Sequence, residues 1–179
     1  WIALVFGVLA IERHANGGRF GPWQAALLWA ASLGAGEIGL SAGAYFVAWE
    51  LWANKGHWRA RIVRLSPHGL VFLLWALFYT SADFGVVGSG LYTDPLDQPW
   101  GYLLEFPLKA VALLGAQGVQ FPADVWIFLP VRGTGLLSFG ALLGLFGLFY
   151  GTWRWVKADP MRRFWFTGML LCVIPVCAG

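Results

Sequence analysis

Charge is the scarcest feature of this sequence. Only 12% of its 179 residues are Asp, Glu, Lys or Arg, about half the share found in a soluble domain. Apolar residues make up 59% of the chain, and its mean hydropathy is +0.65. This composition excludes an ordinary soluble domain and predicts an integral membrane protein. The basic residues lie in short loops between apolar runs and form no stripe, which argues against a nucleic-acid partner.

Cysteine and histidine are also rare, which limits metal and haem chemistry. Cys172 and Cys177 both lie in the last apolar run without CxxC spacing, so we interpret them as packing residues. His14 and His57 are expected in loops, and His68 at the inner start of an apolar run. A membrane haem b needs axial ligands on the spanning helices. We therefore expect neither haem nor metal in this chain.

Five apolar runs predict an all-α, polytopic transmembrane helix bundle with about five membrane passages. The runs cover residues 1–11, 22–52, 65–92, 134–156 and 164–179. Residues 93–133 hold five of the nine prolines and lack an apolar stretch long enough to span a bilayer. The sequence opens and closes inside apolar runs, so we interpret 1–179 as a single transmembrane domain from a longer chain.

The distribution of charge orients these runs. The loops after 22–52 and after 134–156 are basic, and basic loops stay on the cytoplasmic side of the membrane. The proline-rich segment begins with Asp94 and Asp97 and starts and ends on the opposite side. It is therefore predicted to be a cap on the outer face.

Acidic residues inside the apolar runs are the candidate functional groups. Glu37 lies within "GAGEIGLSAG", and a charge at mid-bilayer costs at least ~2.5–3.5 kcal/mol. Ser41 and Tyr45 follow at helical spacing and share its face. The next run supplies Tyr79, Thr80 and Asp83. We predict that both runs line one polar seam, in which Glu37 and Asp83 handle protons, although hydrogen bonds that only join helices would also account for the two acids.

Several segments resemble the NrfD/polysulfide-reductase family of membrane anchor subunits. "PWQAALLWAASLGAGEIGLSAGAYFVAWELW" is similar to the first core helix of that family, and the basic loop "GHWRARIVR" follows it as it does there. "SADFGVVGSG" stands where the family carries an acidic motif, with Asp83 and Gly85 in place but without its Arg-Pro. "LPVRGTGLLSFGALLGLFGLFYG" and "RRFWFTGMLLCVIPVCAG" resemble the next two helices.

The resemblance implies a quinone-interacting membrane anchor subunit of a respiratory oxidoreductase in the plasma (inner) membrane of a bacterium. It implies no haem, a quinone pocket that includes Ser41, Tyr45, Tyr79 and Thr80, and an outer-face partner with iron–sulfur or multihaem centres. Two alternatives stay open. They are a membrane subunit of a transporter, which a helix break near Gly34–Gly39 would favour, and an accessory structural subunit of a larger membrane complex.

Overall fold

The computed structural model describes residues 1–82, 98–103, 106, 109–110, 113–114 and 131–176. In this part of the chain every regular element is a helix, which confirms the predicted all-α class. The chain divides into two compact units, Trp1–Ser89 with Asp159–Val176, and Gly90–Ala158 with Cys177–Gly179. Asp83 and most of the predicted cap 93–133 lie outside the described residues.

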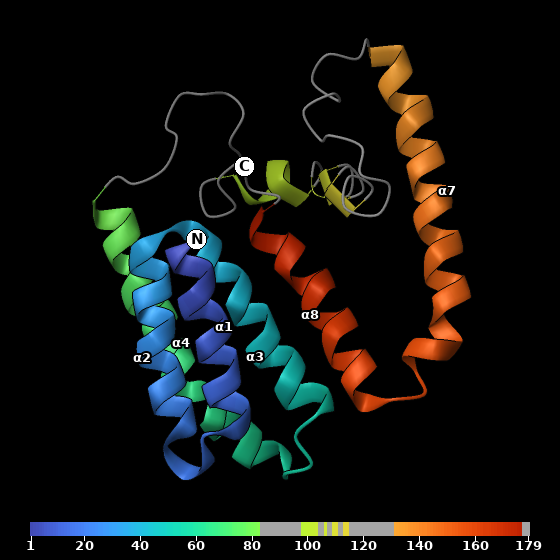
Figure 1. The fold of residues 1–179 in the computed structure, drawn as a ribbon. Coiled ribbons are helices and arrows are strands. Elements are labelled where there is room, and N and C mark those ends of the chain that lie inside the picture. Colours follow the sequence, from blue (N-terminus) through green and yellow to red (C-terminus); the bar gives the residue numbers. More distant parts are fainter. Residues whose placement is uncertain (83–97, 104–105, 107–108, 111–112, 115–130, 177–179) are drawn as a thin grey trace. The chain divides into compact units, whose positions relative to one another are not determined.

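The first unit holds five α-helices and two short 3-10 turns (Figure 1). Its α-helices are α1 (Ile2–Asn16), α2 (Gly21–Ala35), α3 (Leu40–Trp52), α4 (Trp58–Ser81) and α8 (Pro160–Val176), and the 3-10 turns are η1 (Gly18–Phe20) and η2 (Glu37–Gly39). Helix α1 packs on α2 and α3, α4 packs on α2 and α3, and α8 packs on α3. The second unit contains α7 (Val131–Val156).

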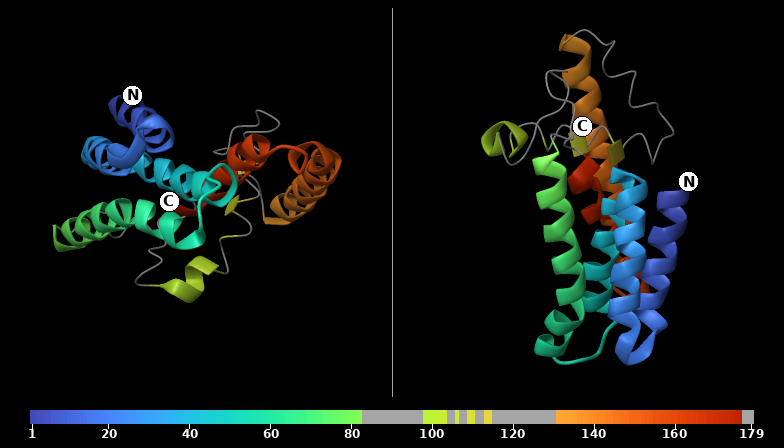
Figure 2. Two further views of the ribbon diagram at one scale, coloured as in Figure 1. Left: turned by 90° about the horizontal axis from the view of Figure 1, so that it is seen from below. Right: turned by 90° about the vertical axis from the view of Figure 1, so that its left-hand side faces the viewer.

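The apolar run 22–52 is two helices rather than the single span we expected. Helix α2 ends at Ala35, Gly36 adopts φ 156° and ψ 153°, and α3 then runs back toward the end of the unit from which α2 started (Figures 1 and 2). A side chain is strained at such a positive φ, so glycine is the residue that suits this turn. The chain reversal places Glu37 at one end of the helices and not in the middle of a span.

Two glycines of this second half allow α3 to approach α2 closely. The Trp29 indole Nε1 donates a hydrogen bond of 2.7 Å to the Gly39 carbonyl. A Cβ at Gly39 would lie 2.7 Å from Ser32 Oγ, and one at Gly43 would lie 2.9 Å from Cζ2 of Trp29. The backbone of η2 therefore meets α2 where a side chain is absent, and Gly43 of α3 leaves room for the Trp29 indole. The core beside this contact consists of Ala10, Trp29, Leu33, Ala42 and Phe46.

The reversal gathers the basic side chains of the first unit at one end. The loop between α1 and α2, the loop between α3 and α4, and the first turn of α8 lie together, because α1 and α3 bond α4 there and α3 bonds α8. These loops and the helix turns next to them hold every Lys and Arg that the structure describes in this unit: Arg13, Arg19, Lys55, Arg59, Arg61, Arg64, Arg162 and Arg163. Glu37 lies at the opposite end.

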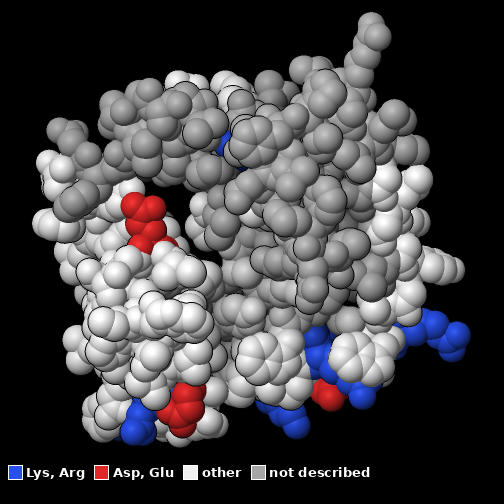
Figure 3. Space-filling view, turned by 45° about the horizontal axis from the view of Figure 1, so that its top comes forward, with Lys and Arg blue, Asp and Glu red and all other residues white. Residues whose placement is uncertain are grey.

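The outer surface of the helices is strongly apolar. The face in Figure 3 carries few charged side chains among its described atoms. Within the described residues, α4 is the one helix whose length and hydropathy suit a membrane crossing, and only 11% of its apolar window is buried. Helices α1 and α2 have 15 residues each and α3 has 13, all shorter than a usual spanning helix of about 20.

Candidate functional site

Glu37 and Tyr79 are two of the residues predicted to line one polar seam, and they are in contact in the structure. The Tyr79 hydroxyl donates to Glu37 Oε1 at 2.5 Å, which joins the turn η2 to the last part of α4. Glu37 is exposed and Tyr79 is half-buried. The prediction that Glu37 is buried is therefore wrong, because the residue lies in the turn where the chain reverses and not within a helix.

Aromatic rings continue from this pair along one face of α4. The Tyr79 and Trp75 ring centroids are 4.8 Å apart with a 32° interplanar angle, and Trp75 stacks on Phe72 at 6.3 Å. Residues 72, 75 and 79 follow the helical spacing, so all three rings lie on the same side of the helix. A flat apolar ring can lie against such a series, with its polar substituents near the carboxyl–phenol pair.

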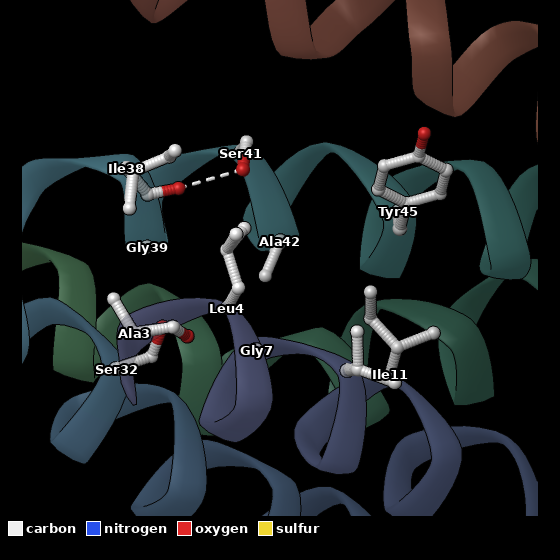
Figure 4. A pocket seen from close by; sticks show the side chains of 11 residues that line it. Ala3, Leu4, Gly7, Ile11, Ser32, Ile38, Gly39, Ser41, Ala42 and Tyr45 are labelled. Atoms are coloured by element: carbon white, nitrogen blue, oxygen red, sulfur yellow. Dashed lines mark hydrogen bonds between the residues drawn. The ribbon is translucent and has the colours of Figure 1, made fainter. Parts of the chain in front are cut away.

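Ser41 and Tyr45 lie beside a different feature, a groove of about 110 Å³ between α1 and α3. Figure 4 shows that its lining is mostly aliphatic and that the Tyr45 hydroxyl points away from α1. The Tyr45 ring packs on α8, with centroids 5.8 Å from those of Phe164 and Trp165. The Ser41 hydroxyl donates to the Ile38 carbonyl at 2.6 Å. Both residues therefore have local structural roles and do not extend the Glu37–Tyr79 pair.

The remaining predicted site residues add no further group to the pair. The Thr80 hydroxyl hydrogen-bonds the carbonyls of Ala76 and Leu77 in its own helix, at 2.9 and 3.2 Å. Asp83 lies outside the described residues. Of the six predicted site residues, the structure thus brings Glu37 and Tyr79 together.

A buried ionic cluster at the basic end was missed by the sequence analysis. Glu50 of α3 is 2% exposed. Its Oε1 lies 2.8 Å from Nε2 of His14 and 3.0 Å from Nε of Arg64, and its Oε2 accepts from Asn54 at 2.5 Å. Three donors thus surround one carboxylate, which satisfies a charge that would be costly to bury alone.

Two arginines of α4 close the ends of two other helices. Arg64 Nη2 donates to the His14 carbonyl at 2.6 Å, in the last turn of α1. Arg61 Nη1 donates to the carbonyls of Glu50 and Leu51 at 2.8 and 3.2 Å, in the last turn of α3. The last carbonyls of a helix lack partners within the helix and carry partial negative charge, so a guanidinium is well suited to both positions.

His14 and His68 are the buried histidines of this cluster, at 1% and 4% exposure. Their ring centroids are 4.8 Å apart and nearly perpendicular, and Phe46 covers His68 at 4.2 Å. Among the described residues, Nδ1 of His14 has no hydrogen-bond partner. His14 was expected in a loop, but the structure places it inside the last turn of α1.

Two signals could have revealed these features from the sequence. The run 22–52 is longer than the ~17–25 residues of a spanning helix, and Gly36 lies near its middle, which together indicate a break. If a break is assumed there, the predicted loop that contains Arg13 lies at the same end as the other basic loops. At that end His14 can contact Glu50. Within the described residues, no group of three or more His, Cys, Asp or Glu is arranged to hold a metal ion.

Comparison of the chain with family models, curated proteins and solved structures finds no match.

Proposed function

We propose that this chain is a quinone-interacting membrane subunit of an electron-transfer oxidoreductase. The observation that carries the proposal is the Glu37–Tyr79 hydrogen bond at the end of the aromatic series on α4. A quinol needs an apolar surface for its ring and a nearby base for its hydroxyl proton. The Glu37 carboxylate is suited to accept that proton, and Tyr79 is suited to orient the carboxylate.

In this proposal the first unit crosses the plasma membrane of a bacterium with its basic end in the cytoplasm. The positive-inside rule supports this orientation, because the described Lys and Arg of the unit share one end. Glu37 and Tyr79 then lie near the outer face. Oxidation of a quinol there releases two protons and two electrons, and the electrons pass to a partner subunit with iron–sulfur or multihaem centres. The Glu37–Tyr79 pair handles protons and carries no electrons itself.

Photoaffinity labelling with an azido-ubiquinone tests the proposal in the full chain reconstituted into lipid nanodiscs. We expect the label on the α4 peptide that contains residues 72–79. Glu37→Gln removes the proton acceptor, so a quinol that competes for the label should bind about tenfold or more weakly, as for a lost charge-assisted hydrogen bond. Tyr79→Phe should weaken it about fivefold.

Thr80→Val is the matched control for this experiment, because within the described residues the Thr80 hydroxyl bonds to carbonyls of its own helix. It should label as the unaltered chain does. Equal labelling of the Glu37→Gln and Thr80→Val variants, or labelling spread evenly over apolar peptides, would refute a quinone site here. In that case an accessory structural role would account for the pair.

The helix break at Gly36 does not support the alternative that the chain is a transporter subunit. Discontinuous helices in transporters leave unwound backbone at a substrate site near the middle of the membrane. Here the chain reverses, and the Trp29–Gly39 hydrogen bond and the close approach of Gly43 to Trp29 fill the space between the helices. Substrate-specific uptake by reconstituted vesicles would be needed to support transport.

A further inference from the structure

We propose that the basic end of the first unit binds anionic phospholipids, and that Arg59 and Arg163 are the side chains that contact their headgroups. This lipid site rests on the membrane location given in the proposed function. It does not depend on quinone binding, because Glu37 and Tyr79 lie at the opposite end of the helices.

Basic residues outnumber acidic residues at this end. The described part of the unit places eight Lys and Arg there, against three acids, Glu12, Glu50 and Asp159. Each acid has an arginine beside it, at 3.8 Å for Glu12–Arg13, 3.0 Å for Glu50–Arg64 and 3.9 Å for Asp159–Arg162. Five basic side chains are then left without an acidic partner among the described residues. This end therefore carries a positive charge that an anionic ligand can neutralise.

The five side chains differ in their surroundings. Arg61 donates to backbone carbonyls at the end of α3, so its role is structural. Arg19 and Lys55 are exposed in two different loops and add to the positive potential of this end. Arg59 and Arg163 are distinct, because each guanidinium lies over an indole ring.

The two arginine–indole pairs flank the loop between α3 and α4. Arg59 Cζ is 5.5 Å from the ring centroid of Trp58, the first residue of α4, and Arg163 Cζ is 5.0 Å from that of Trp52, the last residue of α3. Trp52 Nε1 donates to Thr167 Oγ1 at 2.8 Å, which holds this ring beside α8. Both indoles are exposed. Tryptophan at the end of a membrane helix favours the depth of the lipid headgroups.

A guanidinium stacked on a ring is well suited to bind a phosphate. The cation–π contact uses the face of the guanidinium, so the N–H groups in its plane can still donate to oxygen atoms. Arginine binds phosphate through two parallel hydrogen bonds, and these bonds are stronger than those between neutral groups. Each pair therefore offers a phosphodiester group a charged donor at the depth where such groups lie in a bilayer.

Exposed apolar side chains on α4 distinguish a lipid from other anionic ligands. Ile62 and Val63 follow Arg59 at helical spacing, share its face and are exposed. The same face continues with three further exposed side chains, Leu70, Leu73 and Leu77. A phospholipid also has an anionic head followed by apolar chains. An acidic protein or a nucleic acid would match the charge but leave this apolar face uncovered.

Native mass spectrometry of the full chain in dodecyl maltoside micelles tests the proposal. The probes are palmitoyl-oleoyl phosphatidylglycerol, which is anionic, and palmitoyl-oleoyl phosphatidylcholine, which has the same acyl chains and no net charge. We expect the chain to bind phosphatidylglycerol at least about fivefold more tightly. Arg59→Gln and Arg163→Gln should each lower this affinity about fivefold, the effect of one basic residue near an anionic lipid surface. Binding of phosphatidylcholine should not change.

Arg13→Gln is the matched control, because Arg13 is exposed at the same end but has Glu12 3.8 Å away. It should bind phosphatidylglycerol nearly as the unaltered chain does. Equal affinities for the two lipids in the unaltered chain would overturn the proposal, whether or not any variant folds. A loss for Arg13→Gln as large as that for a folded Arg59→Gln variant would also overturn it.

Polyglutamate distinguishes an acidic protein partner from a lipid, because it offers carboxylates without acyl chains. At an equal concentration of negative charge it should not displace phosphatidylglycerol. Displacement that requires Arg59 and Arg163 would assign this surface to an acidic protein and overturn lipid binding. Quinone labelling of residues 72–79 is a separate result, so either experiment can fail while the other succeeds.

Discussion

At the scale of single residues, Glu50 connects the most elements. It joins α3 to α1 through His14, to α4 through Arg64 and to the loop between α3 and α4 through Asn54. Each of these donors would lose a buried partner if the carboxylate were removed. Glu50 therefore contributes to the stability of the fold whatever the function of the chain is. Glu37 is exposed and is available to take part in a reaction.

Glu50→Ala should destabilise the first unit by about 3–5 kcal/mol, because it leaves the guanidinium of Arg64 partly buried without its anion. Glu50→Gln, which still accepts hydrogen bonds, should cost less. Thermal unfolding in mild detergent, followed by circular dichroism, measures both. Glu37→Ala is the control, since an exposed acid with one hydrogen bond should contribute no more than about 1 kcal/mol. Equal losses for Glu37→Ala and Glu50→Ala would contradict this assignment.

The sequence predicted which residues lie together better than it predicted how deeply they are buried. Glu37 and Tyr79 were both placed in one predicted polar seam, and the structure joins them by a hydrogen bond. Their surroundings were predicted incorrectly, because the burial of Glu37 depended on a continuous helix over 22–52. His14 and Glu50 were missed because each lies near the end of an apolar run, where charged residues usually face water. Only the packing of α1, α3 and α4 brings them together.

At the scale of elements, the α2–α3 hairpin depends on glycine at particular positions. Gly39→Ala should destabilise the hairpin by about 1–3 kcal/mol, because its Cβ would lie 2.7 Å from Ser32 Oγ and 2.8 Å from the Ser32 carbonyl carbon. The added methyl group would also strain the hydrogen bond from Trp29 to the Gly39 carbonyl. The same thermal unfolding measurement applies.

Gly34→Ala is the matched control for the hairpin, because a Cβ at Gly34 would meet nothing within 4 Å. Gly34 lies in α2, and alanine there should leave stability unchanged or raise it by up to about 1 kcal/mol through its higher helix propensity. If Gly39→Ala is tolerated as well as Gly34→Ala, the close packing of Gly39 on Ser32 is wrong.

The helical class followed directly from apolar runs separated by short polar loops, and the structure confirms it. The number of helices within 22–52 could not be predicted in this way, because hydropathy indicates which segments favour lipid and does not indicate where the chain reverses. A positive φ at Gly36 is a backbone property that any glycine can provide, so the four glycines of "GAGEIGLSAG" could not be ranked by composition alone. The structure distinguishes the four glycines, because Gly39 and Gly43 lie close to Ser32 and Trp29 of α2.

At the scale of the whole molecule, the proposed membrane location and the short helices together predict a preference for thin membranes. Helices of 13–15 residues rise about 20–23 Å at 1.5 Å per residue, less than the ~30 Å of a typical hydrocarbon core. A bilayer must thin around such helices, at a cost that grows with the mismatch. The unfolding temperature should therefore be higher in liposomes with acyl chains of about 14 carbons than in liposomes with chains of about 20 carbons. Equal unfolding temperatures in both would count against insertion of these helices across the bilayer.

The central claim is that the chain reverses at Gly36, which places Glu37 and Tyr79 at the outer end and the basic loops at the inner end. Cysteine labelling in oriented membrane vesicles tests it, with Arg19→Cys, Ile38→Cys and Lys55→Cys introduced singly after replacement of Cys172 and Cys177 by alanine. We predict that a membrane-impermeant maleimide labels positions 19 and 55 only from the cytoplasmic side and position 38 only from the outer side. Labelling of positions 19 and 55 from opposite sides, with position 38 protected, would show that 22–52 is one span and would contradict the account.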